Sequence, residues 1–247
     1  MSKLKYTVLI WLLNFCCMSV IGQSQQQRDY FIQNRASLFL GIWDKENSGK
    51  TIKIDSISYD EIPKDLDFRG TVVEALKWSD KSGDNILIQS ISGWFPWKDY
   101  DDIDSTSYMI QDKWEIYAYL FQKKKGETYY KRLWRLYDYN ECFGVDWYAG
   151  FIPKGTTITD IDNNGIAEIS MPYVLICRGG ADPGTMKIIM YEGNTKYAVR
   201  GETEICVGDN PYGGGYKLSD NLNTKTNFKN FLLKLWNIHK CENSRFY

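Results

Sequence analysis

Residues 71–90 read TVVEALKWSDKSGDNILIQS, and this stretch decides the fold class. The segments 71–78 and 85–90 are rich in β-branched and aromatic side chains, which fit the pleated surface of a strand. Between them, residues 79–84 form a polar, Gly-containing segment that is typical of a turn. The stretch therefore predicts an antiparallel hairpin.

The same pattern continues along the chain and predicts a mainly β protein built from antiparallel hairpins. Eighteen Tyr, eleven Phe and nine Trp favour sheets. Further strands are expected at residues 114–121, 129–139, 156–159, 166–176, 186–191 and 196–200. Residues 68–140 and 156–205 pass through strands and turns in a similar order. They predict two related four-strand units resembling propeller blades, although unrelated antiparallel meanders would also look alike.

The C-terminal region carries the one clear helical pattern. Apolar side chains recur at helical spacing, namely Phe228, Phe231, Leu232, Leu235 and Trp236, with Thr226 or Asn227 as the expected N-cap. We expect this helix to lay its apolar side on the sheets. The chain then divides into a signal peptide (1–22), an N-terminal segment (23–50), a β domain (51–210), and a loop with the C-terminal helix packed on that domain (211–247).

The N-terminus is typical of an export signal. Lys3 and Lys5 precede an apolar stretch that ends at Gly22, and a polar Gln-rich run follows. The stretch is short for a membrane span, so we expect cleavage after Gly22 and no transmembrane span in the mature chain. A lipid anchor on Cys16 or Cys17 is the alternative. The predicted location is the periplasm, the cell surface or the medium.

Charge and cysteine content narrow the function classes. Cleavage would remove two lysines and change the net charge from −1 to −3, which argues against nucleic acid as a partner. Four cysteines remain after cleavage, and three pairings are open to them. We expect a disulfide between Cys142 and Cys177, with free thiols as the alternative. Zinc is not expected, because no CxxC or clustered Cys/His pair exists.

Residues 160–168, DIDNNGIAE, have the spacing of a calcium-binding loop. Calcium takes six to eight hard oxygen ligands, and the loop offers them at alternate positions. The predicted ligands are Asp160, Asp162, Asn164, the carbonyl of Ile166, and Glu168. No Glu stands at the twelfth position, so the loop is not an EF-hand; it resembles the DxDxDG loops of FG-GAP and integrin-type blades. The alternative is a type I′ hairpin turn at Asn164-Gly165.

A longer resemblance surrounds this loop. The segments ITDIDNNGIAE (158–168), MKIIMYEG (186–193) and KYAVRG (196–201), together with Cys177 and Pro183, resemble a family of exported bacterial surface polysaccharide biosynthesis proteins. The resemblance spans about residues 50–205 and departs from the family pattern at Arg178 to Asp182. It implies a role in surface-glycan assembly or display, and it supplies no catalytic residues.

Residues 93–104 interleave aromatic and acidic side chains. Aromatic faces stack on sugars, so Trp94, Trp97 and Tyr100 are candidates for glycan binding. Paired carboxylates support glycoside hydrolysis, and the candidates for such a pair are Asp99, Asp101, Asp102 and Asp104. The alternative is that the tryptophans close the end of a sheet while the aspartates form a solvated loop.

Several enzyme classes find no support in the sequence. The sequence has a single histidine, His239, and no nucleophile motif that would pair with it in a Ser-His-Asp triad. No phosphate-binding glycine motif is present either. We therefore expect no catalytic residues and a calcium-stabilised β protein that acts by binding a glycan or a cell-surface protein. A glycan hydrolase and an adhesin or scaffold are the alternatives.

Overall fold

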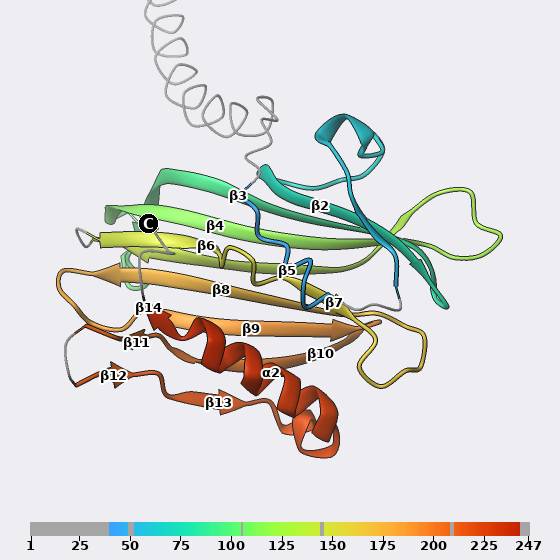
Figure 1. Ribbon diagram of the computed structural model, residues 1–247. Helices are drawn as coiled ribbons and strands as arrows, with labels where there is room; N and C mark the ends of the chain where they lie inside the picture. Colours follow the sequence, from blue (N-terminus) through green and yellow to red (C-terminus); the bar gives the residue numbers. More distant parts are fainter. Residues whose placement is uncertain (1–39, 49–51, 105, 144–145, 208–209, 243–247) are drawn as a thin grey trace, which may run out of the picture.

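The structure, a computed structural model, describes residues 40–48, 52–104, 106–143, 146–207 and 210–242 (Figure 1). The predicted signal peptide, residues 1–22, and residues 23–39 of the predicted N-terminal segment lie outside these ranges. Those parts of the division into segments therefore remain predictions.

The first sheet has five antiparallel strands in the order β1-β2-β3-β4-β5. These are β1 (Ile54–Ser56), β2 (Thr71–Asp80), β3 (Gly83–Tyr100), β4 (Tyr108–Lys123) and β5 (Lys131–Cys142). The hairpin predicted from residues 71–90 is confirmed as β2 and β3, with Asp80 paired to Gly83. A short 3-10 helix, η1 (Tyr59–Glu61), lies between β1 and β2.

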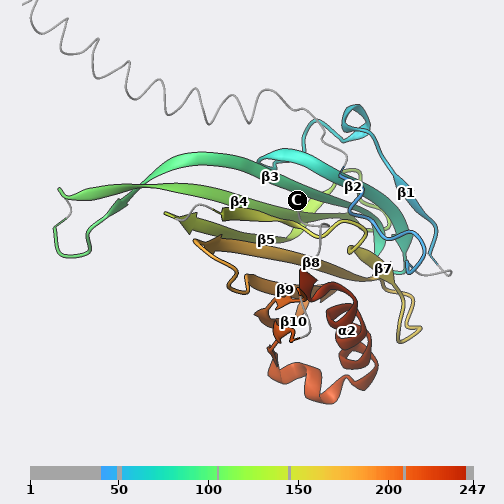
Figure 2. The ribbon, with the colours of Figure 1, turned by 60° about the vertical axis from the view of Figure 1, so that its left-hand side comes forward.

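Strand β3 is much longer than the sequence pattern suggests. After a register shift between Ile91 and Trp94 it stays paired with β4 as far as Tyr100. Strand β2 pairs only as far as Ile91, and β5 pairs no further along β4 than Asp112. The ends of β3 and β4 therefore project from the sheet as a two-stranded ribbon, which Figure 2 shows curving away from the body.

The second sheet has the strand order β13-β10-β9-β8-β6, and β7 also pairs with β8. Its strands are β6 (Asp146–Phe151), β7 (Thr157–Thr159), β8 (Glu168–Arg178), β9 (Thr185–Glu192), β10 (Thr195–Glu202) and β13 (Tyr216–Leu218). A small third sheet joins β11 (Glu204–Ile205) to β12 (Tyr212–Gly213) and β14 (Cys241–Glu242). Residues 68–140 cover a simple meander, whereas β8 in the second segment is flanked by β9 on one side and by both β6 and β7 on the other. A duplication remains a prediction.

The predicted C-terminal helix is confirmed as α2 (Thr226–His239), which follows the short 3-10 helix η2 (Asp220–Thr224). Phe228, Leu232, Leu235 and Trp236 are buried in it, as their spacing predicts. The N-cap differs from the expectation, because Lys225 occupies that position and no side chain caps the first turn. No helix in the described ranges is long and apolar enough to cross a membrane.

Three apolar layers result from the alternation of side chains along the strands. On β8, Ile169 and Met171 belong to the core between the two sheets, whereas Val174 and Ile176 pack toward α2. On β4, Ile116 faces the same central core. The opposite, outer face of β4 packs against the segment 57–68. Because both faces of each sheet are covered over much of their length, the strands read as continuous buried runs.

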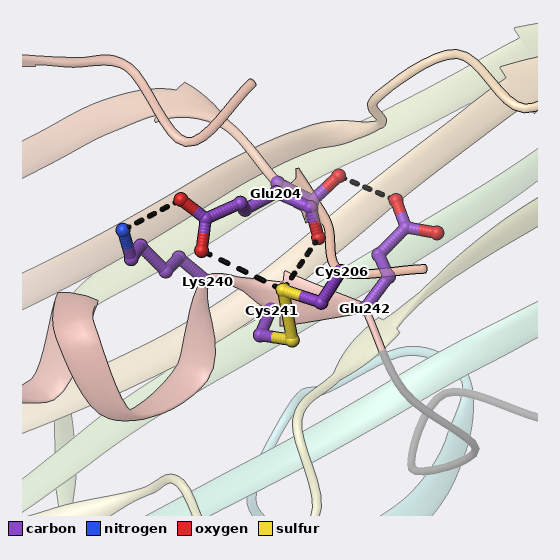
Figure 3. Close-up of a disulfide and its surroundings, with 6 residues drawn as sticks. Glu204, Cys206, Lys240, Cys241 and Glu242 are labelled. Carbon is purple, nitrogen blue, oxygen red and sulfur yellow. Dashed lines mark hydrogen bonds and ion pairs between the residues drawn. A yellow bond between two sulfur atoms is a disulfide. The ribbon is translucent and has the colours of Figure 1, made fainter. Parts of the chain in front are cut away.

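Two disulfides link separate segments within the described residues. Cys142 and Cys177 join β5 to β8, and so join the two sheets, which confirms the expected pairing. Cys206 and Cys241 join the region after β11 to β14. Figure 3 shows this second bond beside Glu204, which pairs with Lys240 at 2.8 Å. Disulfides persist in oxidising compartments, so both bonds are consistent with a protein outside the cytoplasm.

Candidate metal centre

The acidic loop, residues 160–168, connects β7 to β8. The last paired residues of the two strands are Thr159 and Glu168, so eight residues lie between them. A type I′ hairpin turn would hold only two residues between paired strands, so Asn164-Gly165 does not form that turn here. Asn163 and Gly165 have φ angles of 58° and 84°, and these left-handed residues reverse the chain inside the loop.

The three carboxylates of the acidic loop converge. One oxygen from each of Asp160, Asp162 and Glu168 lies within 4.8 Å of the others. The loop backbone holds two of these side chains inward, since the Gly165 amide donates to both Asp160 oxygens at 3.2 Å and the Asn164 amide donates to Asp162 Oδ1 at 3.3 Å. Three of the five predicted ligands therefore lie within reach of one cation.

Glu168 is the most constrained member of the group. Its side chain is fully buried, and its Oε2 accepts hydrogen bonds from the Ile161 amide at 2.7 Å and the Thr159 hydroxyl at 3.1 Å. Its Oε1 is buried and has no hydrogen-bond partner among the described residues. Burial, together with the nearby carboxylates of Asp162 and Glu192, raises the pKa of this carboxyl to about 7. A buried carboxylate in this state needs a proton or a cation.

The other two predicted ligands are less well placed. Asn164 uses its amide within the loop region, where Oδ1 accepts from the Ile166 amide at 2.7 Å and Nδ2 donates to Glu192. To bind a metal, Asn164 Oδ1 would have to give up its hydrogen bond from the Ile166 amide. The carbonyl of Ile166 stays a predicted ligand.

Residues far away in sequence complete the centre. Lys225 places its Nζ 3.3 Å from Asp162 Oδ2 and 3.6 Å from Glu192 Oε2. Lys81 donates from its Nζ to the Asn164 carbonyl. Lys225 thus neutralises part of the negative charge of Asp162 and Glu192, whereas no ion pair joins Asp160 or Glu168 within the described residues.

The turn between β2 and β3 anchors the acidic loop to the first sheet. Asp80 Oδ2 accepts from the Ala167 amide at 3.1 Å and from Trp78 Nε1 at 3.0 Å, and the Lys81 amide donates to the Gly165 carbonyl at 2.9 Å. The sequence suggested only a turn at this place. Nothing local to Asp80, Lys81, Glu192 or Lys225 indicates that they meet the loop, because each lies on another element.

The aromatic candidates lie on two faces of the projecting ribbon. Trp94 and Tyr100 point to the inner face, where Trp94 contacts Trp147 of β6, and Trp97 points to the outer face. The three rings therefore do not form one platform. On the outer face, Lys113 Nζ lies between the rings of Trp97 and Tyr139, at 4.1 and 4.2 Å from their centroids.

The four aspartates of the ribbon do not converge in the way that the loop carboxylates do. Asp101 and Asp104 accept backbone hydrogen bonds in the turn, from the amides of Ile103 at 2.7 Å and Thr106 at 2.9 Å. These and neighbouring hydrogen bonds lower the pKa of both carboxyls. Asp99 accepts a hydrogen bond from Gln111, and among the described residues no three carboxylates of this ribbon converge as those of the acidic loop do.

Comparisons with protein-family models, with curated proteins and with solved structures find no match to this chain. The resemblance to surface polysaccharide biosynthesis proteins and to FG-GAP loops therefore stays a prediction.

Proposed function

We propose that this chain is an exported, calcium-stabilised β protein that acts by binding in the assembly or display of surface glycans. The observation that carries the calcium part is Glu168, a fully buried carboxylate whose Oε1 lacks a partner among the described residues. A buried charge is costly unless it is paired or bound to a metal. A cation held by Asp160, Asp162 and Glu168 would remove that cost.

The chemistry of the donors favours calcium over other metals. All three converging groups are carboxylates, which are hard oxygen ligands, and no Cys or His of the described residues joins them. Calcium accepts irregular sets of carboxylate and carbonyl oxygens, whereas magnesium demands a near-ideal octahedron and keeps several waters. A half-buried loop with mixed oxygen donors therefore suits calcium better.

Calorimetric titration of calcium into the mature chain tests this proposal. We expect one binding site in the wild type and no binding in Glu168→Gln, which keeps the size of the side chain and removes its charge. Asp101→Asn is the matched control, because its carboxylate serves only the ribbon turn, and we expect it to bind calcium like the wild type. A wild type that produces no calcium signal would reject the metal centre.

A glycan-contacting role has separate support on the outer face of the first sheet. The segment 57–68 covers this face as far as Tyr119, and beyond it Tyr137 and Tyr139 keep 40% and 42% of their surface exposed. Tyr117 stacks on Tyr137 with centroids 5.4 Å apart, and Tyr137 lies 5.7 Å from Tyr139. This row of rings continues across Lys113 to Trp97.

Polar groups are fixed between these rings. Glu115 accepts the hydroxyl of Tyr137 at 2.9 Å, and Lys113 pairs with Glu141 at 2.9 Å. A surface of partly exposed rings and oriented polar groups suits an extended sugar chain, which offers apolar ring faces and hydroxyls together. These features support the outer face, rather than the inner one, as the glycan surface.

A glycan array probed with three single variants separates the two faces. We expect Trp97→Ala and Tyr139→Ala to lose the signals of the wild type, and Trp94→Ala, on the inner face, to keep them. Loss confined to Trp94→Ala would move the contact to the inner face. Equal signals from all four proteins would reject a role for these rings.

The alternatives receive different degrees of support. A hydrolase needs a carboxylic acid whose pKa is raised, and Asp101 and Asp104 have lowered pKa values. An adhesin or scaffold gains support from the apolar end of the ribbon, where Ile103, Met109 and Ile110 are exposed. Hydrolysis of any glycan by the wild type, lost in the Asp99→Asn variant, would restore the enzyme alternative.

A further inference from the structure

Lys225 belongs to the acidic loop in space and to the C-terminal segment in sequence. Its Nζ lies 3.3 Å from Asp162 Oδ2 and 3.6 Å from Glu192 Oε2, and about 60% of its side chain is covered, since 39% is exposed. The same ammonium lies 4.6 Å from the centroid of the Phe228 ring in α2. Lys225 thus connects the proposed calcium ligands with the first turn of the helix.

A bound calcium ion and the Lys225 ammonium would share Asp162. Calcium lies about 2.4 Å from its oxygen ligands, so the two positive charges would be roughly 5 Å apart. Coulomb's law for a divalent and a monovalent charge at that separation gives a repulsion that lowers affinity by about tenfold or more, even at the dielectric constant of water. Lys225 therefore competes with calcium without blocking its access to Asp160 and Glu168.

We infer that Lys225 is a built-in competitor for the calcium centre, so that calcium binding and the seating of the start of α2 on the second sheet oppose each other. The inference rests on the proposed calcium site. It follows from thermodynamic reciprocity: if Lys225 weakens calcium binding, calcium must weaken the Lys225 contact by the same factor.

The surrounding contacts place the effect at the first turn of the helix. The Lys225 amide donates to the Leu222 carbonyl at 3.2 Å, and its carbonyl accepts from the Lys229 amide at 2.9 Å, so this residue joins η2 to α2. The rest of the helix is held by apolar packing, with Leu232 and Trp236 buried against the second sheet. Calcium should therefore loosen residues 225–229 and leave the remainder of α2 in place.

Calcium titration of Lys225→Met tests the competition. Methionine keeps the unbranched apolar stem and removes the charge, and we expect calcium affinity to rise by about tenfold or more. Lys229→Met is the matched control on the same helix, because Lys229 makes no ion pair within the described ranges. Its calcium affinity should equal that of the wild type.

Hydrogen exchange tests the reciprocal effect. In the wild type, calcium should speed the exchange of the amides of residues 226–229, and in Lys225→Met calcium should leave their exchange unchanged. Amides of residues 234–239 should respond to calcium in neither protein. Unchanged or slower exchange at residues 226–229 in a calcium-loaded wild type would overturn the inference.

The possible outcomes distinguish failure of the Lys225 competition from failure of the proposed calcium site. Absence of calcium binding in both the wild type and Lys225→Met removes the calcium site, and the inference with it. Equal calcium affinities in the two proteins leave the site intact and reject the competition. Binding that is measurable in both proteins and tighter in Lys225→Met supports both.

Discussion

The acidic loop at 160–168 and the turn of the projecting ribbon at 99–104 contain the same kinds of side chain, yet their environments differ. In the loop, three carboxylates converge within 4.8 Å, and the pKa of Glu168 is raised to about 7 by burial. In the ribbon, Ile103 is 98% exposed. Backbone amides lower the pKa of Asp101, and the hydroxyl and the amide of Thr106 lower the pKa of Asp104. Acidic composition alone therefore does not distinguish carboxylates that converge in a buried site from carboxylates that accept hydrogen bonds in an exposed turn.

The largest expected difference concerns pH. The Glu168 carboxyl keeps its proton up to about pH 7 in the folded chain, whereas in the unfolded chain it loses the proton near its ordinary value of 4.5. The free energy of unfolding without calcium should therefore fall by up to about 3 kcal/mol as the pH rises from about 4.5 to 7. Urea unfolding across this range, with chelator present, measures the fall.

Glu168→Gln provides the control for that experiment. The amide does not titrate, so the variant should lose this part of the pH dependence and be more stable than the wild type at pH 8 without calcium. Identical pH profiles for the two proteins would mean that burial does not perturb Glu168 as described. The exposed Asp101 and Asp104 have lowered pKa values, so any contribution from them has the opposite sign.

Calcium should stabilise the loop and not the ribbon. At a calcium concentration one hundred times Kd, the wild type should gain about 2.7 kcal/mol of unfolding free energy, which calorimetric melting detects as a higher Tm. Asp160→Asn should abolish the gain, because it removes a converging charge. Asp104→Asn should preserve it, and a lost calcium effect in this variant would place the cation on the ribbon instead.

A smaller effect is expected from the glycine that reverses the loop. Gly165 has φ 84°, and a Cβ there would lie 2.6 Å from Cε of Lys81. Gly126, between β4 and β5, has φ 87° with nothing within 4 Å of such a Cβ. Both Gly→Ala changes should cost about 1–2 kcal/mol from backbone strain. Gly165→Ala should lower the free energy of unfolding, measured in urea, by more than Gly126→Ala does, because Lys81 must also move from the Asn164 carbonyl.

The smallest effect is expected at the ribbon aspartates themselves. Asp102→Asn removes an exposed charge, and its effect on the free energy of unfolding should stay within about 0.5 kcal/mol. Chemical unfolding of this variant with and without calcium completes the comparison. A loss of several kcal/mol would indicate that the ribbon contributes to the fold more than its exposure suggests.

The hairpins and the helix were predictable because local patterns govern them. Residues 71–90 and the stripe from Phe228 to Trp236 carry their own periodicity, and the structure confirms both. The extension of β3 to Tyr100 was not predictable in the same way. Its pairing with β4 depends on a register shift at Ile91, and only the partner strand reveals it.

The residues of the candidate site likewise fall into those that the sequence could predict and those that it could not. Asp160, Asp162 and Glu168 lie within nine residues of each other, so their spacing was enough to predict that they converge. Glu192 is 24 residues beyond Glu168, Lys225 is the N-cap of α2, and Lys81 lies in the turn between β2 and β3. No spacing rule connects groups that meet only because the two sheets and the helix are stacked.

By itself, the sequence determined the strand pattern, the apolar side of α2 and an oxygen-rich loop, because each depends on side chains that are neighbours along the chain. Only the tertiary structure decided that Glu168 is buried with one oxygen unpaired among the described residues, that Lys225 pairs with Asp162, and that Trp97 and Trp94 face opposite ways. Burial and charge pairing arise between layers, and so they follow from how the chain packs.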